Sequence, residues 1–397
     1  MSLNDLKRTD IASMLAKRVK AVASSSGEVK DLYSYYPNKL AAELHPAYQE
    51  LVVEEIKEHS PDMKSYVLAP NKKRGAKKLA WFSAGQYLSI RLSINGAKLC
   101  RPYSIASSPA DTLKNRYMIT VKRVWGGIAS EYILDNWTVG TSVTSSAPLG
   151  EFTYEPLRDA ATVIGIAGGS GITPFRSLAY AIAEGDEDCE LILLYGSRTL
   201  SDAVFSDEIA EIAKTCPRVK LVNVLSDEKK KGCENGFITA KLIKKYAPKE
   251  GDYSVFLCGP QAMYRFVDKE IETLGIRRKF VRHELFGEYF DPAKNEDYPK
   301  RVKKSCKVTV RINGEEQTIT CPSDTSLLRA MEAAGIKAPS DCRSGRCGWC
   351  RSQLVSGKVY VPAEVDGRRL ADKDFGYIHP CCSFPLTDVV IDVPKAK

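Results

Sequence analysis

Five of the twelve cysteines in this chain of 397 residues lie near its C-terminal end. They are Cys342, Cys347, Cys350, Cys381 and Cys382, whereas the other seven are scattered singly. Thiolates are good ligands for soft metal ions. Because the chain starts without the pattern of a signal peptide and is long enough to build its own cores, these cysteines indicate a metal site rather than disulfides.

The spacing of these cysteines indicates which kind of metal site to expect. Cys342, Cys347 and Cys350 form the pattern C-x4-C-x2-C, and thirty residues (351 to 380) separate Cys350 from Cys381. This is the arrangement of a [2Fe–2S] cluster, in which two thiolates bind each iron. Structural zinc is the alternative, but zinc sites usually pair two short knuckles and only one is present. Spacing alone leaves the fourth ligand open between Cys381 and Cys382.

Two segments in the first half of the chain have residue types that can bind a ligand. In the first, an Arg can neutralise phosphate, a Tyr ring can stack, and a Ser hydroxyl can form a hydrogen bond. In the second, two glycines and a Ser lie at the start of a predicted helix, where free N–H groups and the helix dipole favour an anion. The residues are Arg101, Pro102, Tyr103 and Ser104 in the first segment, and Lys122, Gly126, Gly127 and Ser130 in the second.

A third glycine-rich segment, residues 165–174, follows an apolar run and leads into a helical pattern. Its glycines permit a tight turn and the close approach of a ligand, Thr173 is expected to cap the helix, and Pro174 suits the first helical position. The spacing is not the G-x-G-x-x-G fingerprint. The candidate binding residues in this segment and at later strand ends are Gly168, Gly169, Gly171, Thr173, Ser197, Arg198, Ser226, Asp227, Cys258, Gly259, Pro260 and Met263.

Taken together, these segments resemble two known families joined in one chain. Residues 101–104 are similar to the R-x-Y-S/T motif of the ferredoxin–NADP reductase superfamily, residues 168–174 to its G-G-x-G-I-T-P loop, and residues 258–263 to its C-G-P-x-x-M segment. Residues 341–359 resemble the cluster loop of plant-type ferredoxin and the strand after it. Flavin, nicotinamide and cluster modules occur in this order in the phthalate dioxygenase reductase type.

The resemblance implies roles for individual residues. Arg101 and the loop from Gly126 to Ser130 would bind the flavin phosphate, and the loop 168–173 would receive the pyrophosphate of the nicotinamide dinucleotide. In the ferredoxin family the last cysteine ligand lies four residues before a proline, which favours Cys381 because Pro385 follows it at that distance. The three expected catalytic residues, which would lie against the flavin ring and the nicotinamide, are Tyr103, Ser104 and Cys258.

The choice of nucleotides depends on two short segments. Residues 147–152 resemble the corresponding segment of FAD-binding members, so FAD is favoured over FMN. Asp227 and Glu228 lie where relatives that prefer NADPH often carry Ser-Arg, and carboxylates there would repel a 2′-phosphate and could accept hydrogen bonds from ribose hydroxyls. NADH is therefore favoured over NADPH, although Arg198 and the lysines at 229–231 argue in the other direction.

Hydrophobic patterns divide the chain into modules. Short alternating strands from about residue 48 predict an antiparallel barrel, and alternating apolar runs and helices from about 160 predict a parallel sheet with helices on both faces. The predicted parts are an N-terminal helical arm and linker (1–47), a flavin-binding barrel (48–156), an NAD-binding α/β domain (157–287), a linker (288–305) and an α+β ferredoxin domain of the β-grasp type (306–397).

The predicted elements follow from these patterns. Helical spacing of apolar residues from Leu6 to Val19 predicts one helix in the arm, with a break at 24–27. Barrel strands are expected at 51–56, 66–68, 87–92, 117–122 and 142–144. The parallel sheet should contain strands at 162–166, 191–195, 220–225 and 253–257, with helices at 174–184, 203–214, 239–246 and 261–274. The last module should contain strands at 307–312 and 316–320 and a helix at 325–335.

Composition excludes several other classes of protein. The chain carries 58 Lys and Arg against 49 Asp and Glu, but the excess is spread along the chain, so a nucleic-acid partner is not expected. No apolar run approaches the roughly 20 residues of a membrane-spanning helix. Without a signal peptide, the expected location is the cytoplasm.

These features predict an NADH-dependent reductase that passes electrons through FAD to a [2Fe–2S] cluster and on to an unidentified redox partner protein. The flavin belongs between the other two groups because it exchanges two electrons with the nicotinamide and one with the cluster. Two alternatives stay open: a non-autonomous electron-transfer subunit of a larger complex, and reverse flow from a reduced carrier to NAD. The electron-transfer subunit of dihydroorotate dehydrogenase is disfavoured, because its last two cysteines are closer together.

Overall fold

The computed structural model describes residues 8–24, 35–94, 97–285 and 287–395. The chain divides into two compact units, residues 1–45 and 46–397. The first contains helices α1 (Arg8–Ala23) and α2 (Tyr36–Leu44). The sequence predicted only α1; α2, which has a proline in its first turn, was missed. Leu6 and residues 25–27 of the predicted break lie outside the described residues.

The second unit begins with an antiparallel sheet, as predicted, in the strand order β4-β3-β6-β1-β2-β5. A bridge between Ile105 and Ile119 joins the end of β4 to β5, so the two edges of the sheet meet and enclose an apolar core. Helix α3 (Ile128–Asn136) packs against this core. The strands are β1 (Tyr48–Ser60), β2 (Met63–Pro70), β3 (Tyr87–Ile94), β4 (Ala97–Ser104), β5 (Tyr117–Lys122) and β6 (Ser142–Ser146).

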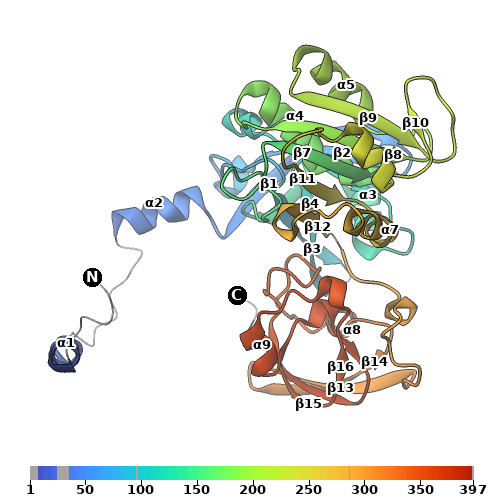
Figure 1. The fold of residues 1–397 in the computed structure, drawn as a ribbon. Helices are drawn as coiled ribbons and strands as arrows, with labels where there is room; N and C mark the ends of the chain where they lie inside the picture. Colours follow the sequence, from blue (N-terminus) through green and yellow to red (C-terminus); the bar gives the residue numbers. More distant parts are fainter. Residues whose placement is uncertain (1–7, 25–34, 95–96, 286, 396–397) are drawn as a thin grey trace. The chain divides into compact units, whose positions relative to one another are not determined.

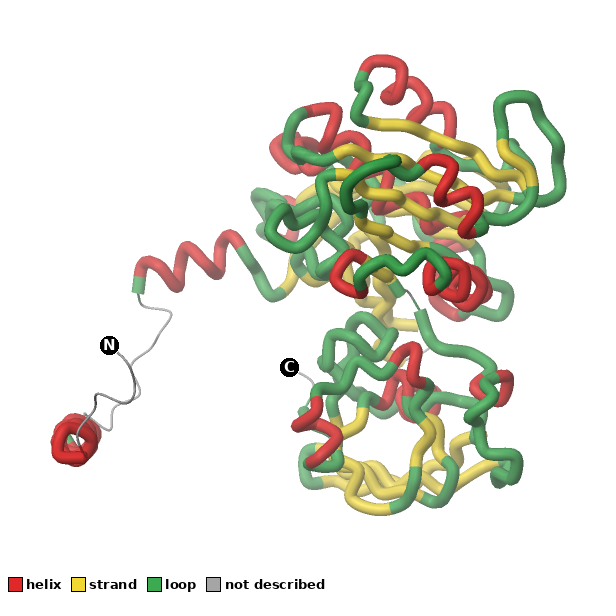
Figure 2. Tube along the Cα trace, viewed as in Figure 1, coloured by secondary structure: helices red, strands yellow, loops and turns green. Residues whose placement is uncertain are grey.

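A parallel sheet follows, in the order β10-β9-β8-β7-β11-β12 (Figures 1 and 2). The four predicted strands and four predicted helices are confirmed, and the short strands β10 and β12 are additional. The strands are β7 (Thr162–Gly168), β8 (Glu190–Ser197), β9 (Val219–Leu225), β10 (Glu234–Asn235), β11 (Ser254–Cys258) and β12 (Val281–Glu284). The helices are α4 (Thr173–Glu184), α5 (Ser206–Thr215), α6 (Ala240–Tyr246) and α7 (Gln261–Glu272).

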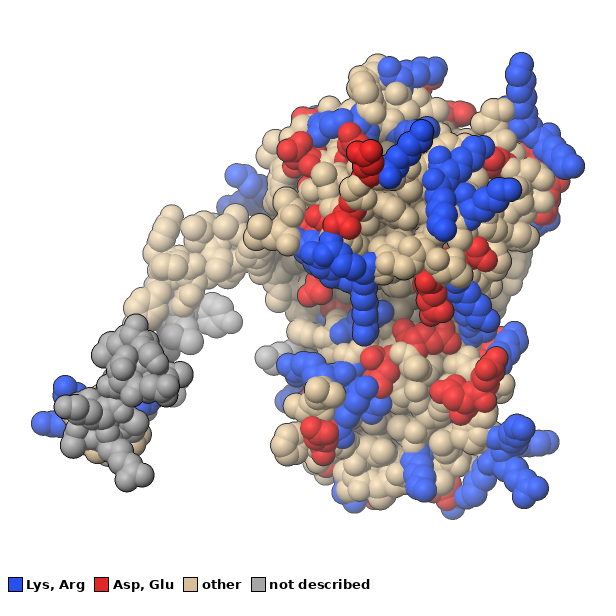
Figure 3. Space-filling model, viewed as in Figure 1, with Lys and Arg blue, Asp and Glu red and all other residues tan. Residues whose placement is uncertain are grey.

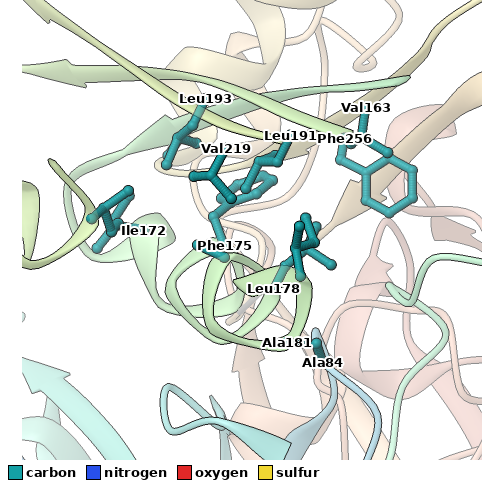
Figure 4. Packing of buried hydrophobic residues seen from close by; sticks show 14 of the residues in the cluster. Ala84, Val163, Ile172, Phe175, Leu178, Ala181, Leu191, Leu193, Val219 and Phe256 are labelled. Atoms are coloured by element: carbon teal, nitrogen blue, oxygen red, sulfur yellow. The ribbon is translucent and has the colours of Figure 1, made fainter. Parts of the chain in front are cut away.

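The core on one face of this sheet is built around Phe175 of α4, which is fully buried and lies near Leu191 and Val219 of the strands (Figure 4). Ala84, from the loop before β3, belongs to the same apolar cluster. The barrel and the parallel sheet therefore share part of one core, which fixes the position of one against the other.

The last module has a five-stranded sheet in the order β14-β13-β19-β15-β17, a small pair of β16 and β18, and helix α8 (Leu327–Ala333). Strand β19 runs parallel to β13, and the other pairs are antiparallel, as in a β-grasp fold. The strands are β13 (Ser305–Ile312), β14 (Glu315–Pro322), β15 (Ser352–Ser356), β16 (Val359–Tyr360), β17 (Tyr377–Ile378), β18 (Phe384–Pro385) and β19 (Val389–Asp392), and a short helix α9 (Leu370–Asp374) precedes β17.

The segment 288–305, which the sequence analysis interpreted as a linker, packs onto this last module. Tyr289 lies in its apolar core, and the Tyr289 hydroxyl donates to Glu364 at 2.6 Å. The Tyr360 hydroxyl donates to Asp297 at 2.6 Å. This segment therefore has the composition of a linker, but contacts with aromatic residues attach it to the last module.

Two properties of the surface complete the fold. Acidic and basic side chains are interspersed on the face that Figure 3 shows, in keeping with a net charge that is spread along the chain. Among the described residues, no helix has the length and apolar character needed to cross a membrane.

Candidate functional site

The carboxyl ends of β7 and β11, where the nicotinamide is expected to bind, are neighbours in the parallel sheet. The chain leaves β7 toward β8 on one side, whereas β11 lies on the other, so this is a switch point of the topology, where open α/β sheets bind ligands. The two turns are in close contact. A Cβ on Gly171 would lie 2.5 Å from the carbonyl carbon of Cys258 and 2.8 Å from the Cα of Gly259.

The three glycines of the loop after β7 have different roles. Gly171 faces the backbone of Cys258, and a Cβ on Gly168 would overlap the sulfur of Met263, so both glycines are required by packing within the protein. Gly169 has φ +53° and no atom within 4 Å of the Cβ position. The expected space for a ligand is therefore seen at Gly169 rather than at all three positions.

Thr173 does not cap α4, which corrects the sequence-based expectation. The helix starts at Thr173 itself, and its hydroxyl donates to the carbonyl of Ser170 at 3.0 Å instead of accepting from an N–H group in the first turn. Pro174 lies in the first turn as predicted. The turn of 3-10 helix at 169–172 places the chain in helical geometry before α4 begins, so no side-chain cap is needed.

Cys258 is fully buried and lies directly beside Glu284, the last residue of β12. Burial raises the pKa of the Cys258 thiol, and burial together with the charge of Cys342 raises that of Glu284. The Cys258 thiol is therefore uncharged at pH 7, and burial favours the protonated form of Glu284. Sequence reasoning missed Glu284, because a Glu after a short strand carries no signal; its significance comes from its burial between Cys258 and the cysteine loop.

On the flavin side, the hydroxyl of Ser104 is buried and has no hydrogen-bond partner among the described residues. A buried polar group in that state needs a partner, and the polar edge of a flavin ring supplies one. Tyr103 packs against the barrel core with part of its ring exposed. Ser104 and Tyr103 therefore fit a flavin on this strand.

Two expected phosphate ligands already have partners inside the protein. The Gly126 N–H donates to the carboxylate of Glu131 at 2.9 Å, so an anion occupies that helix start. The Arg101 guanidinium lies 3.4 Å from Glu288. At Gly126 a phosphate would take the place of the carboxylate, whereas Arg101 has five N–H donors and can bind a phosphate while it stays beside Glu288.

In the parallel sheet, Arg198 follows β8 and pairs with Asp227, which follows the neighbouring strand β9, at 3.0 Å. The hydroxyl of Ser226 donates to the same carboxylate at 2.6 Å. These bonds to Ser226 and Arg198 lower the pKa of Asp227, so it is ionised at neutral pH. Ser197 closes β8 at the same edge.

The four expected cluster ligands form two pairs. The Cys350 thiol lies 3.4 Å from that of Cys381, and the Cys347 N–H donates to the Cys342 sulfur at 3.3 Å. Hydrogen bonds within the pairs lower the pKa of Cys342 and of Cys381, which favours thiolates. Two pairs of sulfur donors match a dinuclear cluster in which each iron takes two.

Cys382, the alternative fourth ligand, lies 3.5 Å from the carbonyl of His379. His379 is buried, and its Nδ1 lies 2.7 Å from the carbonyl of Gly345 in the cysteine loop. A Cβ on Gly345 would overlap the carbonyl of Val365, so the tight loop requires glycine there, where φ is +77°.

Comparison with known proteins agrees with this geometry. Three family models match in order: an oxidoreductase FAD-binding domain at residues 50–154, an oxidoreductase NAD-binding domain at 166–269, and a 2Fe-2S iron-sulfur cluster binding domain at 310–386. The ferredoxin reductase component of 3-ketosteroid-9-alpha-monooxygenase from Rhodococcus rhodochrous is 30% identical over 347 residues, which are 85% of this chain and 94% of that protein. This chain is a member of the same reductase family.

Two further comparisons extend the match. The glycine betaine monooxygenase reductase subunit from Chromohalobacter salexigens is 26% identical over 329 residues, which are 79% of this chain and 88% of that protein. The structure of phthalate dioxygenase reductase matches with a TM-score of 0.62 and 27% identity, covering 87% of this chain and 98% of the other. This reductase is thus an NAD(P)H-dependent flavoprotein that passes electrons through FAD to a [2Fe–2S] cluster.

Proposed function

We propose that this reductase oxidises NADH and supplies single electrons from its cluster to the terminal oxygenase of a multicomponent system. The flavin, when bound, accepts an electron pair and releases single electrons. The proposed cluster ligands are Cys342, Cys347, Cys350 and Cys381. A cytoplasmic location stays a prediction.

The observation that carries the proposal is the convergence of the strand ends of the parallel sheet on the cysteine loop. Cys258 at the end of β11 lies beside Glu284 at the end of β12, and Glu284 is within electrostatic reach of Cys342. Ser104, with its free hydroxyl, lies at the end of β4 in the barrel that shares a core with this sheet. The end of the parallel sheet that is proposed to receive the nicotinamide is therefore within electrostatic reach of the cysteine loop.

The chain's residues prepare this path in distinct ways. Tyr103 and Ser104 would orient the flavin ring by stacking and by one hydrogen bond, and the buried Cys258 would present an uncharged thiol at the point where the nicotinamide arrives. The preference for NADH is supported by the ionised Asp227, which would repel a 2′-phosphate if the ribose binds at the end of β9. An oxygenase as acceptor is supported by the relatives, which are reductase components of a ketosteroid monooxygenase and of a glycine betaine monooxygenase.

An anaerobic titration of the cluster-loaded flavoprotein with NADH tests the proposal. Bleaching of the flavin together with the rhombic electron paramagnetic resonance signal of a reduced [2Fe–2S] cluster is the expected result. A protein that binds both groups but stays oxidised with NADH would refute a stand-alone NADH reductase. Reduction by NADPH alone would then point to the other nucleotide, and reduction only with added partner protein would point to a subunit of a larger complex.

A further inference from the structure

A carboxylate in the segment between the second and third modules contacts both the flavin-binding strand and the cysteine loop. Glu288 is 8% exposed and forms an ion pair with Arg343, which directly follows Cys342 and is fully buried. The same carboxylate lies 3.4 Å from Arg101 of β4 and 3.9 Å from Arg329 of α8. Acidic and basic side chains lie close together where these modules meet (Figure 3).

The charges in this group depend on one another. Arg343 also pairs with Glu332 at 2.5 and 2.8 Å, so three guanidinium groups share two carboxylates. Burial and the neighbouring charge of Arg343 lower the pKa of Arg101, which means that the two arginines repel each other. Glu288 is the carboxylate that touches both. Without the charge of Glu288, the repulsion between Arg101 and Arg343, which little water screens, would push β4 and the cysteine loop apart.

A neutral contact lies beside the ionic one. The Cys100 thiol, next to Arg101 in β4, donates to the carbonyl of Ser340 at 3.0 Å and lies 3.8 Å from the carbonyl of Asp341. Asp341 directly precedes Cys342. The cysteine loop is therefore held against β4 from both sides of Cys342, by Cys100 before it and by Arg343 after it.

We propose that Glu288 is a positioning residue for electron transfer, which holds the cluster loop at Cys342 against the flavin strand β4. The inference rests on the passage of electrons from flavin to cluster in this family. Each NADH releases two electrons and the cluster accepts one at a time, so an electron passes from the flavin to the cluster twice in each turnover. Electron transfer slows as the distance between the two groups grows, so a cysteine loop that moves away from β4 would slow reduction of the cluster.

The variant Glu288→Gln tests the proposal, because it keeps the shape of the side chain and removes its charge. The matched control is Glu364→Gln: Glu364 also joins two modules, since it lies 3.8 Å from Arg265 of α7, but it does not touch β4. Both variants are purified with flavin and cluster and mixed anaerobically with NADH. Flavin reduction and cluster reduction are followed separately by stopped-flow absorbance.

For Glu288→Gln we expect flavin reduction at the wild-type rate and cluster reduction slowed several-fold. Glu364→Gln should leave both rates unchanged. Hydrogen exchange of the amides at 340–344, measured on the oxidised protein, should become faster in Glu288→Gln and stay unchanged in Glu364→Gln. This readout does not depend on activity.

Cluster reduction at the wild-type rate in Glu288→Gln, or an equal slowing of both steps, would overturn the proposal. If Glu288→Gln does not retain the cluster, Glu288→Asp replaces it: the charge is kept but shortened, and an intermediate rate is expected, whereas the wild-type rate would overturn the proposal. Absence of cluster reduction in the wild-type protein would refute the function proposed above and not this role of Glu288, which the hydrogen exchange still tests.

Discussion

The contact between Gly171 and the turn after β11 leads to a sharp prediction for Gly171→Ala. The new Cβ would lie 2.5 Å from the carbonyl carbon of Cys258, whereas ordinary contact begins at 3.4 Å, so the turn at Cys258 must retreat by about 1 Å. Inserting a methyl group into such a packed place costs roughly 1–3 kcal/mol. The lower entropy of the unfolded chain with Ala offsets about 0.4–1 kcal/mol of this.

The net loss of about 1–2 kcal/mol should lower the melting temperature of the NAD-binding module by roughly 2–8 °C. We expect a larger effect on catalysis than on stability, because Cys258 lies where nicotinamide and flavin are proposed to meet. A displacement of about 1 Å there predicts a fall in kcat/KM for NADH on the order of a hundredfold. Melting is followed by circular dichroism, and kcat/KM by the rate of flavin reduction at low NADH.

Gly185→Ala provides a matched control. Gly185 ends α4, the helix that begins just after Gly171, and has φ +87° with no atom within 4 Å of the Cβ position. Placing Ala in the left-handed region costs about 1–2 kcal/mol, similar to the loss at Gly171, but it displaces nothing at Cys258. We expect lower stability with unchanged kcat/KM. A Gly171→Ala protein with the wild-type rate, or a Gly185→Ala protein that loses as much rate, would refute the reasoning.

Three further predictions concern single side chains. Cys381→Ser should abolish the visible absorption of the cluster, whereas Cys382→Ser should retain it; loss in the second variant alone would reassign the fourth ligand. Asp227→Asn removes the negative charge that pairs with Arg198, so kcat/KM for NADPH should rise roughly tenfold while that for NADH falls a few-fold; an unchanged ratio would contradict this role. Burial raises the pKa of Glu187 to about 7, above its value in the unfolded chain, so stability is lost as pH rises from about 4.5 to 7. Glu187→Gln should therefore raise the melting temperature at pH 8 and not at pH 4.5, and an equal rise at both would count against this pKa shift.

Several properties of this protein could be predicted from the sequence because they depend on neighbours along the chain. The spacing of Cys342, Cys347 and Cys350 predicted a dinuclear cluster, and the periods of the apolar residues predicted the barrel and the parallel sheet. The capping role given to Thr173 was wrong, since a preceding turn of 3-10 helix removes the need for a side-chain cap.

Local patterns could not show which charges are buried. Arg343 reads in the sequence as one of several basic residues beside the cluster ligands, but it is fully buried with Glu288 and Glu332 and contributes nothing to the surface. Segment 288–305 has the composition of a linker, yet it carries Glu288 and the core residue Tyr289. A buried ion pair depends on partners that the fold supplies, and those partners are distant in sequence.

The sequence by itself determined the cofactor chemistry of this reductase, because the cysteine spacing and the glycine-rich turns are local patterns. The tertiary structure decided how those groups are brought together. Cys100 meets Ser340 across 240 positions of the chain, and Cys258 meets Glu284 only because β11 and β12 are paired. Contacts of that kind follow from packing and topology, so they leave no repeated spacing in the sequence.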